Sequence, residues 1–202
     1  MPMRFFDYLL EQPLFFGLSQ LPFTRQKFAR ISRHTDFSKV KQVLDVGCGP
    51  GTNAPNFSHA GYLGIDINPR YIDLARRRFH RDFLVADATT YLAPQGSRFD
   101  FILVNSFLHH IDTAHVSRIL AHLATLLSPD GYIHSVELVL PECSGLPRLL
   151  ATMDRGKFAR SLTSWRNLFG LHLQTEIFEA FSITHFGCRI MDLVYYKGRA
   201  KL

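Results

Sequence analysis

The sequence predicts an α/β fold with a doubly wound, mostly parallel sheet. From about residue 42 onward, apolar runs of strand length alternate with segments of helix length, which is the pattern of βαβ units. The first run leads directly into a glycine-rich turn, and the last two segments alternate apolar and polar residues as an antiparallel hairpin does. A chain of 202 residues, 47% of them hydrophobic, can bury one sizeable core, so we expect a single domain over 1–202.

The elements follow from local sequence signals. Strands are expected at residues 43–46, 62–65, 83–86, 101–104 and 132–138, and a closing hairpin at 171–184 and 188–196. A helix over 69–80 begins with Pro69, which suits a first helical turn, and one over 113–127 stops at the turn signal Ser128-Pro129-Asp130-Gly131. A further helix is expected to begin near Thr52 or Asn53, directly after the glycine turn.

The chain divides into four functional stretches. Residues 1–40 precede the first strand and are expected to form two helices that cover the cofactor or substrate side. Residues 41–140 form the cofactor-binding core, and residues 171–202 form the terminal hairpin. Between them, Pro141, Gly145 and Pro147 break the pattern, which indicates a substrate-side insertion over 141–170 with helical character at 149–169.

The formal net charge of +6 raises the question of nucleic acid as a partner. The basic residues are spread at mixed spacing on predicted helices: Arg25, Lys27, Arg30, Arg33, Arg76, Arg77, Arg78 and Arg81. Solvated helix faces explain this distribution better than a phosphate-binding track does. In the insertion, Arg155, Lys157 and Arg160 are open to two interpretations, contacts to an anionic substrate or a polar loop–helix junction.

Composition also bears on the cellular compartment. Cys48, Cys143 and Cys188 are odd in number and widely spaced, unlike a disulfide framework or a metal-binding pair. Charges and Pro13 interrupt the apolar amino-terminal stretch well short of a membrane-spanning length. We therefore expect a cytoplasmic protein without a signal peptide or membrane span, and the sequence leaves a homo-oligomer open.

The most informative segment is VLDVGCGPG, residues 43–51, an apolar strand that ends in Asp45 and enters a glycine turn. Glycine allows a backbone to approach a ligand closely and to adopt positive φ. Dinucleotide-binding turns require G-x-G-x-x-G or -A, but Thr52 occupies the third position here. A carboxylate beside the turn suits a cationic amino acid better than a pyrophosphate.

This segment resembles the first motif of class I S-adenosylmethionine (SAM)-dependent methyltransferases, and the resemblance continues over about residues 40–140 and the terminal hairpin. It implies a Rossmann-like seven-stranded sheet of order 3-2-1-4-5-7-6 that binds SAM and releases S-adenosylhomocysteine (SAH). The cofactor-binding residues that it implies are Asp45, Gly47, Cys48, Gly49, Gly51, Asp66, Ile67, Asp87, Ala88 and Asn105. Cys48 is interpreted as a small tolerated residue rather than a nucleophile.

The resemblance assigns individual roles after the second and third strands. Asp66 would accept hydrogen bonds from the ribose hydroxyls while Ile67 packs against adenine. Asp87 would accept from the adenine amino group, with the Ala88 amide on a ring nitrogen. The alternative for Asp66 is to cap the helix that begins near Pro69, although Asn68 is the better candidate for that role.

The fourth strand indicates the type of acceptor. Methyltransferases that act on exocyclic base nitrogens or glutamine carry (D/N)-P-P-(Y/F) at this strand end, whereas this chain has Asn105-Ser106-Phe107 and then Leu-His-His-Ile. That ending resembles small-molecule methyltransferases. His110, or else His109, would act as a general base, with fixation of the loop as the alternative role for His110.

The two histidines are sequence neighbours, so we expect their side chains to diverge, and without a supporting second ligand pair we expect metal-free operation. The resulting hypothesis is methyl transfer from SAM to an oxygen or nitrogen of a small molecule. The alternatives are a SAM-binding or interaction protein without catalysis and, less favoured, an RNA methyltransferase.

Overall fold

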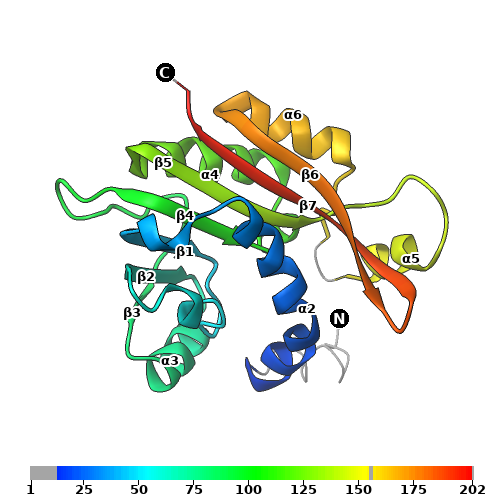
Figure 1. Cartoon of the computed structure of the whole chain (residues 1–202), viewed down its shortest axis with the longest axis horizontal. Coiled ribbons are helices and arrows are strands. Elements are labelled where there is room, and N and C mark those ends of the chain that lie inside the picture. The colour runs from blue at the N-terminus through cyan, green and yellow to red at the C-terminus, as the bar shows by residue number, and fades with distance from the viewer. Residues whose placement is uncertain (1–12, 155–156, 202) are drawn as a thin grey trace.

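The computed structural model describes residues 13–154 and 157–201. Its sheet has seven strands in the order β3-β2-β1-β4-β5-β7-β6, which confirms the expected order (Figure 1). The strands are β1 (Gln42–Val46), β2 (Gly61–Asp66), β3 (Asp82–Val85), β4 (Phe99–Asn105), β5 (Leu127–Leu138), β6 (Leu173–His185) and β7 (Cys188–Ala200). Strands β1 to β5 pair in parallel, and β7 lies antiparallel between β5 and β6.

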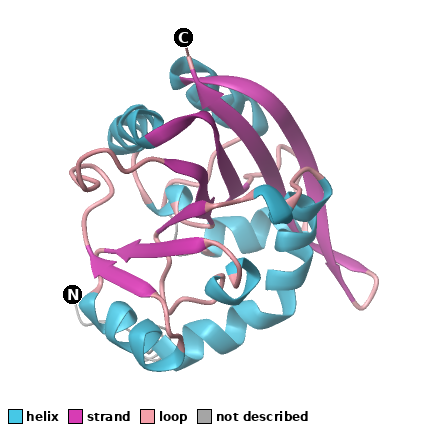
Figure 2. Ribbon diagram, turned by 60° about the vertical axis from the view of Figure 1, so that its left-hand side comes forward, coloured by secondary structure: helices cyan, strands magenta, loops and turns pink. Residues whose placement is uncertain are grey.

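Helices cover both faces of the sheet, as Figure 2 shows. The described α-helices are α2 (Pro13–Arg33), α3 (Pro69–Arg78), α4 (Thr113–Leu126), α5 (Leu146–Met153) and α6 (Leu162–His172). One buried cluster joins the sheet to α4 and α6, and a second joins the opposite face to α2, α3 and α5. Within the described part of the chain, no helix is long and apolar enough to cross a membrane.

Alternation along β1 explains how one short strand serves both layers. Leu44 and Val46 belong to the cluster with α4 and α6, whereas Val43 belongs to the cluster with α2 and α3. All three side chains are completely buried. Burying an aliphatic side chain stabilises a fold by about 1.5–3 kcal/mol, so this strand anchors the sheet at its centre.

The segment after the glycine turn differs from expectation. The α-helix expected to begin near Thr52 or Asn53 is wrong, since the structure has only a short 3₁₀ helix, η2 (Ala54–Phe57). The physical reason is the short connection, because β2 already begins at Gly61. Pro55 also lacks the amide that a continuing helix would use.

The amino-terminal cover is described in part. Helix α2 is followed by a 3₁₀ helix, η1 (Phe37–Lys39), and Ile31 of α2 is completely buried against the sheet. Any helix expected within residues 1–12 lies outside the described residues. The interpretation of the α2 basic residues as a solvated face is wrong for Lys27, which is only 5% exposed.

The insertion and the hairpin complete the fold. The helical stretch expected at 149–169 consists of α5 and α6, and the expected hairpin is confirmed as β6 and β7. Phe186 and Gly187 connect these strands with φ values of 48° and 77°. Two consecutive positive φ values match the twist of a two-residue hairpin turn.

Candidate active site

Five of the ten sequence-predicted cofactor residues lie together at the carboxyl ends of the parallel strands. A cleft of about 180 Å³ is lined by Gly47, Asp66, Ile67, Asp87 and Ala88 together with Phe107 and the start of α4. Ligands of open α/β sheets bind at this edge, where the strand order reverses between β1 and β4. A larger cavity, of about 630 Å³, lies at the opposite strand ends and contains none of the predicted cofactor residues.

The glycines of the turn differ in what surrounds them. All three have positive φ, and a Cβ at Gly49 would meet nothing within 4 Å, so the backbone here is open to a ligand. At Gly51 a Cβ would lie 2.9 Å from the Phe83 ring, and at Gly47 it would lie 2.7 Å from Phe107. Gly51 is therefore required by packing, while Gly49 leaves space that a cofactor could fill.

Cys48 points away from the cleft. Its side chain is 3% exposed and belongs to the core cluster beneath the turn. Burial and the nearby carboxylates of Asp45 and Asp66 raise the pKa of the Cys48 thiol far above its ordinary value. A thiol that does not ionise is a poor nucleophile, which agrees with its interpretation as a small core residue.

Asp66 connects the glycine turn to the end of β2. Its Oδ2 accepts from the Gly49 amide at 3.0 Å, and its Oδ1 accepts from the Asn68 amide at 2.8 Å. Burial raises the pKa of Asp66, and the two amides act in the opposite direction. Asn68, not Asp66, caps α3, since its side chain accepts from the Arg70 amide.

Asp45 lies beneath the turn at 0% exposure. Its Oδ2 accepts from the Tyr62 hydroxyl at 2.7 Å and from the side-chain Nδ2 of Asn53 at 3.2 Å. Its Oδ1 has no hydrogen-bond partner among the described residues. Burial raises the pKa of Asp45 to about 7, which the bonds from Tyr62 and Asn53 only partly offset. A buried carboxylate with an unused acceptor is suited to a nearby cation.

The end of the cleft at which the sequence predicts adenine contains Ile67 and Asp87. Ile67 is 69% exposed beside the cleft, an uncommon state for a large apolar side chain. Asp87 already accepts from the amide and hydroxyl of Thr89 through Oδ1, both at 2.7 Å. These two bonds are the main reason that the pKa of Asp87 is lowered. A contact to adenine would therefore use Asp87 Oδ2.

The end of β4 carries a backbone strain and an unexpected lysine. Ser106 has a φ of 57°, a left-handed conformation that a non-glycine residue adopts at a cost. The Lys27 Nζ donates to the Ser106 hydroxyl at 2.8 Å. Burial lowers the pKa of Lys27 to about 8, against the attraction of Glu137 and Asp154. Asn105 also joins the Asp45 network, because its side-chain Nδ2 donates to Asn53 Oδ1 at 3.3 Å.

His109 is fixed by a buried carboxylate. Its Nδ1 lies 2.7 Å from Oε2 of Glu137, which is 0% exposed. Glu137 also accepts from the amides of Phe107, Leu108 and His109, so it holds the whole 3₁₀ helix η3 (Leu108–His110). A carboxylate that accepts several amide bonds is well compensated for burial.

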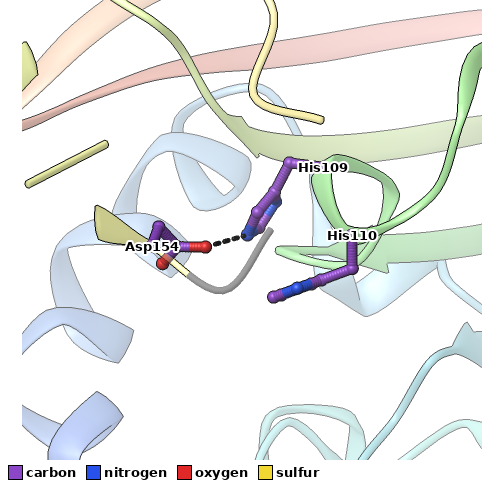
Figure 3. Close-up of side chains that lie close together, drawn as sticks. All are labelled: His109, His110 and Asp154. Carbon is purple, nitrogen blue, oxygen red and sulfur yellow. Dashed lines mark ion pairs between the residues drawn. The ribbon is translucent and has the colours of Figure 1, made fainter. Parts of the chain in front are cut away.

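The expectation that His109 and His110 diverge is wrong. In η3 their ring centroids lie 4.2 Å apart with planes inclined by 38° (Figure 3). The 3₁₀ turn, which is neither an extended strand nor an α-helix, directs both rings to the same region. Asp154, at the end of α5, approaches His109 Nε2 to 3.7 Å. His110 is exposed, whereas His109 is buried.

Arg160 attaches the insertion to this loop. It is 8% exposed, and its guanidinium donates to the carbonyls of Leu108, Ile111 and Phe158. Its plane also lies over Trp165, 4.9 Å from the ring centroid. The junction interpretation therefore describes Arg160 better than contact with an anionic substrate, while Arg155 lies outside the described residues.

The sequence did not single out Lys27 or Glu137 as residues of the site, and it gave Asp154 no role. The mixed spacing of the basic residues favours a solvated face for Lys27, and nothing in the local sequence indicates that Ser106, 79 residues away, lies beside it. Glu137 carried a usable signal, since it is the only acid of the expected strand 132–138 and lies between Val136 and Leu138. A carboxylate at such a position must be compensated, so it marks a polar network.

Comparison with known proteins gives a consistent result. Residues 43–131 match a family described as a methyltransferase domain. A phthiotriol/phenolphthiotriol dimycocerosates methyltransferase from Mycobacterium ulcerans is 33% identical over 118 residues, which are 55% of this chain and 42% of that protein. A ubiquinone biosynthesis O-methyltransferase from Thiobacillus denitrificans is 29% identical over 100 residues, 46% of this chain and 42% of that protein. The chain thus matches less than half the length of these relatives.

The fold is similar to solved methyltransferases. The N-methyltransferase NodS from Bradyrhizobium japonicum WM9, solved in complex with SAH, superimposes with a TM-score of 0.70. The superposition covers 90% of this chain and 89% of NodS, at 18% sequence identity. The mitomycin 7-O-methyltransferase MmcR gives a TM-score of 0.71 at 18% identity, covering 98% of this chain and 61% of that chain.

Proposed function

We propose that this chain, whose residues 43–131 match a methyltransferase domain, is a class I SAM-dependent methyltransferase that transfers the methyl group of SAM to an oxygen or nitrogen atom of a small molecule. The observation that carries this proposal is the cleft at the carboxyl ends of β1, β2 and β4, which is lined by five of the ten residues that the sequence assigns to SAM. Bound SAM supplies a methyl group on a positively charged sulfur.

The residues present fit this cofactor. The open backbone at Gly49 leaves room for the amino acid portion, and the unused oxygen of Asp45 would complement its ammonium group. Asp66 would accept from the ribose hydroxyls, since each oxygen of a carboxylate accepts more than one bond. Exposed Ile67 would lose contact with water when it packs against adenine.

The protein contributes alignment and exclusion of water. Methyl transfer from a sulfonium is an in-line displacement that needs no covalent enzyme intermediate, so positioning supplies much of the acceleration. Phe107 and Ile111 line the cleft beside η3 with apolar surface. His110 is exposed next to them and would accept the proton of a hydroxyl or amine acceptor.

We assign the acceptor side to the segment 141–170. Helix α5 presents exposed Leu146, Leu149 and Met153, and Arg160 attaches the segment to η3. The small-molecule assignment rests on Asn105-Ser106-Phe107 in place of a (D/N)-P-P-(Y/F) motif. It is supported by the O- and N-methyltransferases among the similar proteins. Three free cysteines support a reducing compartment such as the cytoplasm.

The test is a panel of phenols, carboxylic acids and amines incubated with SAM that carries a deuterated methyl group. Mass spectrometry would detect the labelled methyl on an acceptor, and Gly49→Ala would provide the matched inactive control. Transfer to one acceptor class supports the proposal. SAH binding without transfer to any member would favour the catalytically silent alternative, and salt-dependent binding of RNA with transfer to it would favour the RNA methyltransferase.

A further inference from the structure

A second chemical feature lies beside the cleft, where η3 meets the end of α5. His109, His110 and Asp154 place one ligand atom each within 4.8 Å of one another (Figure 3). Asp154 is far from the histidines in sequence, so the fold of the insertion brings these groups together. One ligand is buried, one is partly buried and one is exposed.

The hydrogen bonding of His109 determines which ring nitrogen is available. Glu137 is held by three backbone amides and can only accept at Oε2, so the hydrogen of the neutral ring lies on His109 Nδ1. The lone pair of Nε2 is then directed toward Asp154. Metal-binding histidines show this arrangement, because a carboxylate on the second nitrogen fixes the ring and raises its basicity.

The facing atoms are both acceptors. His109 Nε2 and Asp154 Oδ1 are 3.7 Å apart, which is too long for a hydrogen bond. Two ligands at zinc–nitrogen and zinc–oxygen distances of about 2.1 Å lie roughly 3.4 Å apart in tetrahedral geometry. The observed separation is thus close to one edge of a coordination polyhedron, and the His110 ring lies on the side that remains open to solvent.

We propose that His109, His110 and Asp154 bind a divalent transition-metal ion, with Glu137 as the residue that orients His109. Two imidazoles and one carboxylate form a ligand set that suits Zn²⁺ or Co²⁺, and three protein ligands leave a position open for water or an acceptor oxygen. The ion would also link η3 to α5. This proposal replaces the expectation of metal-free operation drawn from the sequence. With the ion bound, His110 is a ligand, so its proposed role as a base applies to the metal-free protein.

Two nearby cationic side chains determine how strongly the site is expected to bind a metal ion. Lys27 interacts electrostatically with Glu137 and Asp154, and Arg160 interacts with Glu137. Their positive charge opposes a metal ion, so binding should be weaker than in a thiolate-rich structural zinc site.

The experiment titrates chelator-treated full-length protein without a histidine tag with Zn²⁺, by calorimetry, and with Co²⁺, by visible absorption. One ion per chain is expected, with d–d bands that indicate nitrogen and oxygen ligands. His110→Ala and Asp154→Asn should each weaken affinity at least tenfold. His80→Ala, which removes another exposed histidine, should leave affinity unchanged.

Circular dichroism would establish that each variant is folded. The proposal is overturned if folded wild-type protein binds neither ion, or if His110→Ala and Asp154→Asn both bind with wild-type affinity, which would indicate adventitious surface binding only. Because the readout is metal binding, the result does not depend on methyl transfer. If the wild-type protein binds Co²⁺ but does not bind SAH, the result counts against the proposed function and not against the metal site.

Discussion

The backbone amide of Gly49 donates to Oδ2 of Asp66 across 3.0 Å, so the glycine turn and the expected ribose acceptor form one unit. Asp66→Ala should therefore have two effects, loss of a ribose contact and loosening of the turn. SAH affinity should fall by about 1.5–3 kcal/mol, the range for hydrogen bonds to a charged group.

A ligand comparison by calorimetry separates the two effects. An SAH analogue without ribose hydroxyls should lose much less affinity than SAH does, because only the loosened turn affects it. If both ligands lose the same affinity, Asp66 acts by stabilising the turn and not by contacting the ribose.

Gly49→Ala should reduce SAH affinity more than it reduces stability. The new Cβ meets no protein atom within 4 Å, so it occupies space that the cofactor needs. The φ of +53° adds a strain of roughly 1 kcal/mol. Gly96→Ala is the matched control, because Gly96 has a φ of +82° and equally open surroundings away from the cleft. We expect the two variants to have similar melting temperatures and only Gly49→Ala to lose affinity for SAH. If both variants bind SAH with equal affinity, the turn is not part of the cofactor site.

The raised pKa of Asp45 predicts that the stability of the protein depends on pH. Burial raises its pKa from 3.8 to about 7, so the folded state holds this proton more tightly than the unfolded state. Its contribution is fully present below about pH 4 and is lost as the pH rises toward 7. Asp45→Asn lacks this titration, so its stability relative to wild type should increase by up to about 1.4 kcal/mol per pH unit across that window. Urea unfolding between pH 5 and 8 measures this difference, and parallel profiles for the two proteins would argue against it.

His110→Ala should lower turnover of the true acceptor by ~10²-fold or more while SAH affinity is retained. His110 is not among the residues that line the cleft, so its removal leaves the lining of the predicted cofactor site in place. His80→Ala provides the control for removal of an exposed imidazole. A His110→Ala variant that melts earlier but turns over normally would show that this ring only fixes the loop.

The sequence predicted the elements well where periodicity is strong. Strands β1 to β4, α3 and α4 begin and end within two residues of their expected bounds, because each has a continuous apolar run or a clear cap such as Asn68. Strand β5 begins at Leu127 rather than at residue 132, so the turn expected at 128–131 is wrong and those residues extend the strand. The prediction of an α-helix after Gly51 was wrong because the connection to β2 is short and contains Pro55. Such a length constraint becomes visible only when the start of β2 is known.

The site was predictable only in part. Gly47, Asp66, Ile67, Asp87 and Ala88 could be located because their motifs end consecutive parallel strands, which must meet at one edge of the sheet. Lys27, Glu137 and Asp154 come from α2, β5 and α5, and their proximity to η3 depends on tertiary packing. Neighbouring histidines were expected to diverge, but a 3₁₀ turn held by Glu137 brings the rings together.

The most direct test of the central claim is the effect of SAH, SAM and NAD on the unfolding of the wild-type protein, combined with calorimetry. A ligand of the folded state adds about 2.7 kcal/mol of stability at a hundred times its dissociation constant. SAH and SAM should each raise the melting temperature and titrate at one site per chain, and NAD should do neither. Stabilisation by NAD with no effect of SAH or SAM would contradict the account.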